Sequence, residues 1–450
     1  MKKIYSYILL LLSLTSCKKI LEIDTPIDRI TTDIVFADDA TANLAVTGLY
    51  NRMMEQNSYI TSGAMTIYCG LTADEFTNTS PGVDDEFSTN SISTTNSIVE
   101  QNFWASAYSL IYHANSIIEG LERSKGVSSQ MKKQLKGEAE FVRALVYFNM
   151  VNIFSDVPLI VSTNYKENAA VARMDRALIY EQIQRDLLDA TTALPDSYNP
   201  NERVRATKWT AYALLARVYL FRKDWTNARS TASVVIGSGQ FGLVNNITEV
   251  FKQNSTETIF QLNPVVVSIS TWEGNLFIPG SGAIPNYSIN SGLLSIFDSS
   301  DLRLANWISS TNVGGVNYYY PFKYQIKSGS GDESYIVLRY AEQFLIRAEA
   351  NTQLNNISEA QNDLNIVRQR AGISPTTANT SNDLLLAIED ERRREYFAEW
   401  GFRWIDLKRT DHATAVLSAL KPNWQPTDTL FPIPISEIRK NNLLTQNAGY

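Results

Sequence analysis

Three regularly spaced glutamates near the C-terminus are well placed to do chemistry: Glu391, Glu395 and Glu399. On an α-helix their four-residue spacing puts all three carboxylates on one face. Two carboxylates across a substrate can hydrolyse a glycosidic bond, provided that one keeps its proton in apolar surroundings. The neighbouring side chains are instead basic: Arg392, Arg394 and Arg403. We therefore expect an ion-pair network that fixes the terminal helix, and we predict no enzyme activity.

The other familiar catalytic and metal-binding motifs do not occur in the sequence. It contains no nucleophile elbow, P-loop or zincin motif. The two histidines, His113 and His412, have no metal-ligand spacing, which argues against zinc. The many Asp and Asn side chains leave a loop-bound calcium open, although no EF-hand spacing occurs. We predict no cofactor and no metal. The net charge of -7, without a basic stripe, argues against a nucleic-acid partner.

Aromatic side chains gather among Gly, Ser and Asn between residues 241 and 337. Flat rings cover the C–H faces of sugars, and Tyr, Ser, Gly and Asn together make rigid contact surfaces. We hypothesise that a ligand platform is formed by Trp272, Tyr287, Tyr318 and Tyr319. The alternative, which stays open for each ring, is packing within a small core of this stretch. We assign Tyr324 and Tyr335 to packing.

A second candidate wall lies between residues 58 and 98, where Ser, Thr, Asn and Gly crowd together. No helical period is visible there, so we predict long loops. Within them, Asp74, Asn78 and Asn96 are candidate ligand contacts, because a binding site needs a few fixed hydrogen-bonding groups.

The elements that must position these groups are helical hairpins. In residues 338–372 the apolar stripe of the first helix recurs at helical spacing: Ala341, Phe344, Leu345 and Ala348. Ser358 and Gln361 predict a capping box for the second helix, and Gly372 supplies a left-handed residue to end it. The same pattern recurs in residues 207–237, with Asp224 before the second helix.

Such a helix pair of about 34 residues cannot bury its apolar face alone, which is the logic of tetratricopeptide repeats. We expect further pairs from helices at 131–154 and 178–194, and from helices at 38–54 and 101–122. The predicted fold is mainly α, with about four tetratricopeptide-like hairpins and a loop-rich insertion at 241–337. A plain all-α bundle is the alternative.

The N-terminus predicts export. A short apolar core follows two lysines and ends at small residues before Cys17, which resembles a bacterial lipobox. An ordinary cleavage site with an incidental cysteine is the alternative. We assign residues 1–16 to a lipoprotein signal peptide and 17–34 to a tether lipidated at Cys17. Only Cys69 remains, so a bridge to Cys17 is the one possible disulfide.

Several motifs of the chain resemble the SusD/RagB family of outer-membrane lipoproteins. The C-terminal signature comprises Glu391-Arg392, Glu395, Glu399, Gly401, Arg403, Asp406-Leu407 and Arg409. Further matches are Leu338-Arg339-Tyr340-Ala341-Glu342, the Phe431-Pro432-Ile433-Pro434 turn and the Gln446-Asn447-x-Gly449-Tyr450 ending. The similarity divides the chain into an N-terminal region at 35–240, the insertion, and a C-terminal region at 338–450.

The resemblance implies a surface-exposed lipoprotein of the outer membrane that takes part in polysaccharide utilization. Such proteins capture an oligosaccharide, or in some members a peptide, and cover a SusC-like TonB-dependent transporter. The helical side is expected to face the transporter, and the loops meet the ligand. Residues 58–98 contain no Trp. That departs from a starch-like aromatic arc and leaves another glycan or a peptide as the ligand.

Overall fold

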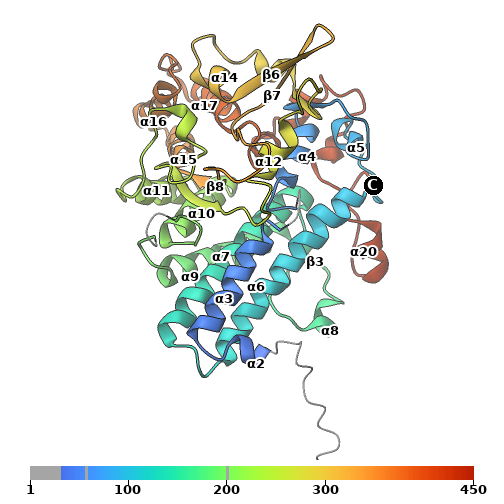
Figure 1. Ribbon diagram of the computed structural model, residues 1–450, viewed down its shortest axis with the longest axis vertical. Coiled ribbons are helices and arrows are strands. Elements are labelled where there is room, and N and C mark those ends of the chain that lie inside the picture. The colour runs from blue at the N-terminus through green and yellow to red at the C-terminus, as the bar shows by residue number, and fades with distance from the viewer. Residues whose placement is uncertain (1–31, 56–58, 199–201) are drawn as a thin grey trace, which may run out of the picture.

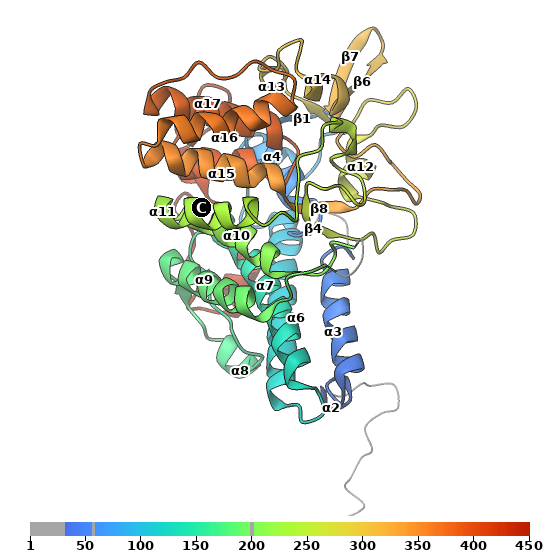
Figure 2. The same ribbon diagram turned by 90° about the vertical axis from the view of Figure 1, so that its left-hand side faces the viewer.

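The computed structural model describes residues 32–55, 59–198 and 202–450. Its helices stack along the long axis of the molecule, and an irregular, loop-rich region covers one side of the upper half (Figures 1 and 2). The predicted signal peptide, Cys17 and most of the predicted tether lie outside the described residues. Within the described part of the chain, no helix combines the length and apolar composition needed to cross a membrane.

Four antiparallel helix pairs make up the stack within these described ranges, as the sequence predicted. They are α3 (Asp39–Arg52) with α6 (Ser106–Arg123), α7 (Ser129–Phe154) with α9 (Arg176–Ala193), α10 (Lys208–Phe221) with α11 (Trp225–Ile236), and α15 (Tyr340–Gln353) with α16 (Ile357–Arg370). Helix α11 packs directly on α15, although the whole insertion separates them in sequence. The mainly α, repeat-like architecture is therefore confirmed.

Several ends of these helices follow local capping chemistry. Asp224 caps α11 by accepting a hydrogen bond from the Asn227 backbone N–H at 3.2 Å. After α16, Gly372 adopts the left-handed conformation with φ of 75°. The capping box predicted from Ser358 and Gln361 is wrong. Helix α16 begins at Ile357, two residues earlier than a Ser358 cap requires, and the Gln361 side chain instead donates to the carbonyl of Ala378 at 2.6 Å.

The prediction of long loops between residues 58 and 98 is also wrong in part. Helix α4 (Ala64–Thr72) lies in this stretch, and every one of its residues is buried. A helix that is enclosed all round carries no polar face, so its sequence shows no helical period. It packs against α18 (Phe402–Arg409) in the centre of the upper half.

The insertion is held by short antiparallel ribbons. Strand β4 (Thr258–Leu262) pairs with β8 (Tyr335–Arg339), β1 (Phe76–Asn78) with β5 (Tyr287–Ile289), and β6 (Ile308–Val313) with β7 (Val316–Pro321). A further ribbon, outside the insertion, joins β2 (Val157–Pro158) to β3 (Arg173–Met174) in the connection between α7 and α9. The remaining elements are α2 (Thr32–Val35), α5 (Asp85–Ser88), η3 (Val99–Ala105), α8 (Tyr165–Asn168), η4 (Ile247–Glu249), α12 (Trp272–Phe277), α13 (Ser291–Leu294), α14 (Leu302–Asn306), α17 (Ser381–Tyr396), α19 (Ala413–Leu417), η5 (Pro426–Thr429) and α20 (Ile435–Lys440).

Candidate functional site

The three glutamates of α17 and the turn after it form a buried ionic cluster. Nη1 of Arg303 donates to Glu391 at 2.7 Å and to Glu395 at 2.9 Å. Glu399 accepts from Arg339 at 2.9 Å. Burial alone would raise the pKa of Glu395, but Arg370, Arg339 and Arg303 hold it well below its usual range. An ion-pair network forms as predicted, although two of the three predicted arginine partners, Arg392 and Arg403, are wrong, and Glu395 is ionised rather than poised as a general acid.

The partners of this cluster come from distant parts of the chain rather than from the neighbouring arginines alone. Of the three predicted partners, Arg394 approaches Glu391 at 3.9 Å. Arg392 instead pairs with Asp406 at 2.7 Å, and Arg403 with Asp74 at 2.8 Å. The network therefore ties the insertion, the last hairpin and the C-terminal helices together.

Two of the four aromatic platform candidates are interior residues. Trp272 begins α12 and is buried, and its indole N–H donates to the carbonyl of Met54 at 3.2 Å. Tyr287 is buried in β5, and its hydroxyl donates to Asp84 at 2.9 Å. Both rings therefore pack within the protein, which is the alternative that the sequence left open. Neither presents a face on which a sugar could stack.

The other two candidates, Tyr318 and Tyr319, lie in β7, in a hairpin that projects at the top of Figure 1. Tyr319 is 37% exposed and Tyr318 is half-buried. Successive side chains of a strand point to opposite faces. The two rings therefore cannot form one continuous plate, although Tyr319 is accessible to solvent.

The three polar candidates from the second wall all form hydrogen bonds within the protein. Asp74 is buried between Arg403 at 2.8 Å and Arg393 at 2.7 Å. Asn96 is buried, and its carbonyl oxygen accepts from the Ile98 backbone N–H at 2.9 Å. These two side chains hold the fold together.

Asn78 is half-buried and donates to Asp85 at 2.7 Å. It also lies opposite Tyr287 across the β1–β5 ribbon. The two predicted walls therefore do meet, but largely through backbone pairing and interior contacts.

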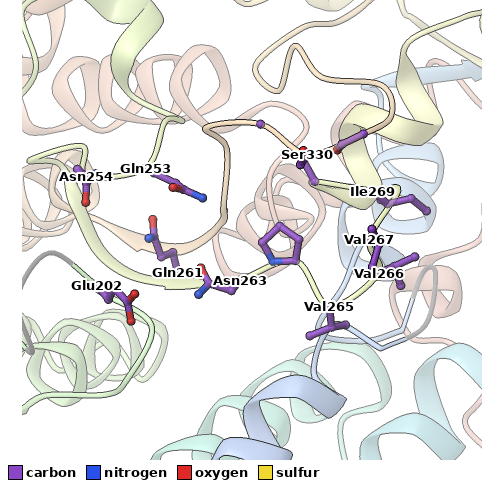
Figure 3. A pocket seen from close by; sticks show the side chains of 14 residues that line it. Glu202, Gln253, Asn254, Gln261, Asn263, Val265, Val266, Val267, Ile269 and Ser330 are labelled. Atoms are coloured by element: carbon purple, nitrogen blue, oxygen red, sulfur yellow. Dashed lines mark hydrogen bonds between the residues drawn. The ribbon is translucent and has the colours of Figure 1, made fainter.

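An open pocket that the sequence did not predict lies at the end of β4. It has a volume of about 460 Å³ (Figure 3). Its polar lining residues are Glu202, Gln253, Asn254, Gln261, Asn263, Ser270 and Ser330. Its apolar lining residues are Pro264, Val265, Val266, Val267 and Ile269. Figure 3 shows the carboxamides of Gln253, Asn254 and Gln261 on one side and the valines on the other. We call this cavity the Gln261 pocket.

Backbone hydrogen bonds between three loops hold the Gln261 pocket in shape. The Gln261 N–H donates to the carbonyl of Arg203 at 2.9 Å, which ties β4 to the loop before α10. The Gly329 N–H donates to Ser268 at 2.7 Å, and the Ser270 hydroxyl donates to Gly329 at 2.9 Å. Gly329 has a φ of 93°, a conformation that favours glycine in this turn.

Gln261 is the polar group whose surroundings are most unusual. Its side chain is 4% exposed, and its Oε1 has no hydrogen-bond partner among the described residues. A buried acceptor without a partner costs free energy, so such an atom in a pocket is suited to receive a donor from a ligand. Gln253, Asn254 and Asn263 are exposed nearby, and each amide both donates and accepts.

The described residues that line the pocket include no aromatic, Lys, Arg or His side chain. Throughout the described ranges, no group of three or more His, Cys, Asp or Glu side chains is placed to hold a metal ion. The arrangement is suited to reversible binding of a polar ligand with an apolar edge. The only hint in the sequence was the group of amide side chains on either side of the segment that forms β4.

Comparison with models of known protein families shows which family this chain resembles. A family model described as starch-binding and associating with the outer membrane matches residues 23–220, and a model of the SusD family matches residues 287–450. The chain belongs to the SusD/RagB family. The two matched stretches leave out residues 221–286, and this SusD/RagB chain builds most of the Gln261 pocket from that segment.

Relatives and solved structures agree with this assignment. The SusD-like protein P25 of Formosa agariphila is 24% identical, over 100% of this chain and 99% of its own length. A SusD superfamily protein of Bacteroides vulgatus superposes with a TM-score of 0.83 at 21% identity, covering 92% of this chain and 100% of the other. A laminarin-binding SusD-like protein superposes with a TM-score of 0.76 at 22% identity, with the same coverage. These structures share the fold of this SusD/RagB protein.

Proposed function

We propose that this SusD/RagB protein captures oligosaccharides at the cell surface, without cleaving them, and passes them to a SusC-like TonB-dependent transporter. Lipid on Cys17 would hold it on the outer membrane, and the Gln261 pocket would hold the ligand. The main observation in support of binding is that one cavity has carboxamide side chains on one side and aliphatic side chains on the other. Amides match the hydroxyls of a sugar, and valine side chains match its C–H faces.

The comparisons support the same class of ligand. One matching family model is described as starch-binding, and one neighbour of the same fold binds laminarin. Neither comparison fixes the sugar for this chain, because most of the lining of the Gln261 pocket comes from residues between the two matched stretches.

The binding role is tested by a glycan array, followed by calorimetry on the glycans that bind. Asn263→Ala removes one exposed amide from the lining. We expect it to weaken binding roughly fivefold to tenfold, since one hydrogen bond contributes about 1 kcal/mol. Asn382→Ala is the matched control, because Asn382 is an exposed asparagine on α17, outside this pocket. If no glycan binds, the proposal is refuted.

A peptide is the second candidate ligand, because the described lining contains no aromatic ring on which a sugar could stack. Side-chain amides also pair with the N–H and C=O groups of an extended peptide. A library of unstructured peptides belongs in the same binding assay. Peptide binding that Asn263→Ala weakens, without any glycan binding, would favour this candidate.

Anchoring and delivery need separate tests. Mass spectrometry of the protein from membranes should show a diacylglycerol-modified Cys17, and Cys17→Ala should release the protein from the membrane fraction. Purification of the lipidated protein in mild detergent should recover a TonB-dependent transporter with it. Recovery of the protein alone from membranes that contain the transporter would contradict delivery by a stable complex.

A further inference from the structure

The charges around the Gln261 pocket set a preference among ligands. Glu202 is the one ionisable side chain among the described residues of its lining, and it is exposed. Beside the pocket, the carboxylate of Asp332 lies 3.6 Å from Lys252, which is also 3.2 Å from Glu249. One ammonium therefore faces two carboxylates there, and Glu202 adds a further negative charge.

The nearest cations on adjoining elements are directed elsewhere. The Arg203 guanidinium donates to the backbone carbonyls of Thr258, Thr256 and Gln240. It also lies 5.0 Å from the centre of the Phe241 ring. Lys327, on the loop that carries Gly329, donates to the carbonyls of Asn275 and Ile278. Neither cation forms part of the lining, so an anionic ligand would meet the Glu202 carboxylate without a cation among the described lining residues to offset it.

Gln261 adds a second, independent requirement. Its Oε1 is buried without a partner in the described part of the chain, so a hydroxyl that donates to it removes an existing free-energy cost. A sugar hydroxyl can donate to it. A carboxylate or sulfate group placed against Oε1 offers acceptors alone, so the part of the ligand at this position must carry a hydroxyl.

The apolar wall completes the match to an uncharged sugar. Val267 is 94% exposed, and Val265 and Val266 are half-buried beside it. An exposed aliphatic surface of this kind favours the C–H face of a ring and gives nothing to a charged substituent.

From this geometry we propose that the Gln261 pocket selects uncharged, hydroxyl-rich oligosaccharides over those that carry uronate or sulfate groups. Oε1 of Gln261 accepts a hydrogen bond from a sugar hydroxyl, and Glu202 repels anions. This selectivity rests on the proposed glycan-binding function and goes beyond it by naming the chemical class of the ligand.

The test compares affinities for a panel of neutral oligosaccharides, made from laminarin, starch and mannan, with a panel of oligouronates and sulfated oligosaccharides of the same length. We expect the wild-type protein to bind at least one neutral member roughly tenfold or more tightly than any anionic member at low salt. The ratio of neutral to anionic affinity should fall at high salt, because ions screen the charge of the exposed Glu202.

Two variants with matched controls separate the two features. Glu202→Gln should raise anionic affinity relative to neutral affinity, whereas Glu167→Gln, an equal charge change on exposed α8, should not change that ratio. Gln261→Met keeps the size of the side chain and should weaken neutral binding roughly tenfold. Gln343→Met is its control, because Gln343 is also buried with an unpartnered Oε1 but lies in α15, outside the pocket.

Failure of this inference and failure of the glycan-binding proposal give different results. Anionic probes that bind as tightly as neutral ones would overturn the selectivity and leave glycan binding intact. Neutral binding that Gln261→Met does not change would overturn the role of Gln261. The absence of binding to every probe would refute the glycan-binding function itself, and the inference with it.

Discussion

Glu75 lets the structure predict how stability depends on pH. It is fully buried next to Asp74, and neither of its carboxylate oxygens has a hydrogen-bond partner among the described residues. Burial, with a smaller contribution from the Asp74 charge, raises the pKa of Glu75 from 4.5 to about 8. The folded protein therefore keeps this carboxyl group protonated at pH 7, whereas the unfolded chain releases the proton.

The sign and size of the effect follow from this difference. Below pH 4.5 both states hold the proton, so Glu75 does not make stability depend on pH there. As pH rises from 4.5 towards 8, the unfolded state gains free energy by ionising, and stability falls. Between pH 4.5 and pH 7, at 1.36 kcal/mol per pH unit, the loss is about 3 kcal/mol.

Glu75→Gln removes this titration and keeps the size of the side chain. We expect the variant to lose about 3 kcal/mol less stability than the wild-type protein between pH 4 and pH 7. Urea unfolding, followed by circular dichroism at each pH, measures the difference. Glu167→Gln is the control, because Glu167 is exposed on α8. If the stability of Glu75→Gln changes with pH in parallel with the wild-type protein, the reasoning is refuted.

Two further predictions concern the ionic cluster and metals. Glu395→Ala leaves Arg303, Arg339 and Arg370 without a shared buried carboxylate. We expect it to lower the free energy of unfolding, measured in urea, by about 3–5 kcal/mol. Glu359→Ala, on the exposed face of α16, is the control. A loss below about 1 kcal/mol would contradict a structural role for this cluster. Because no cofactor is expected, dialysis against EDTA should leave both the glycan affinity and the unfolding midpoint unchanged, and a fall in either that calcium restores would show a metal site.

The sequence was most informative where structure is locally periodic. The pairs at 207–237 and 338–372 were predictable because apolar residues recur at helical spacing and local residues end the helices. Helix α4 was not predictable by the same rule, since it is buried on every side and has no polar face. The predicted capping box of α16 is absent, because the Gln361 side chain donates to the carbonyl of Ala378, outside its own helix.

The candidate site shows a second limit of prediction from the sequence. The sequence located the aromatic residues in the insertion, but their burial depends on partners far along the chain, as when Trp272 donates to Met54. The Gln261 pocket combines Glu202, the segment 253–270 and the turn at 329–331. No period connects these three segments, and only the folded chain brings their side chains together.

Because β4 pairs with β8, the insertion leaves the helical stack and returns to it at neighbouring points, and α11 and α15 remain in contact. This geometry allows one insertion to be exchanged for another without a change in the helical stack. Its ionic anchors, Arg303 and Lys323, bind carboxylates of the C-terminal region, whereas residues 263–270 supply most of one pocket wall and make no ion pair in the described ranges. Grafting a relative's 263–270 segment would therefore transplant ligand preference while the repeats that carry it stay intact.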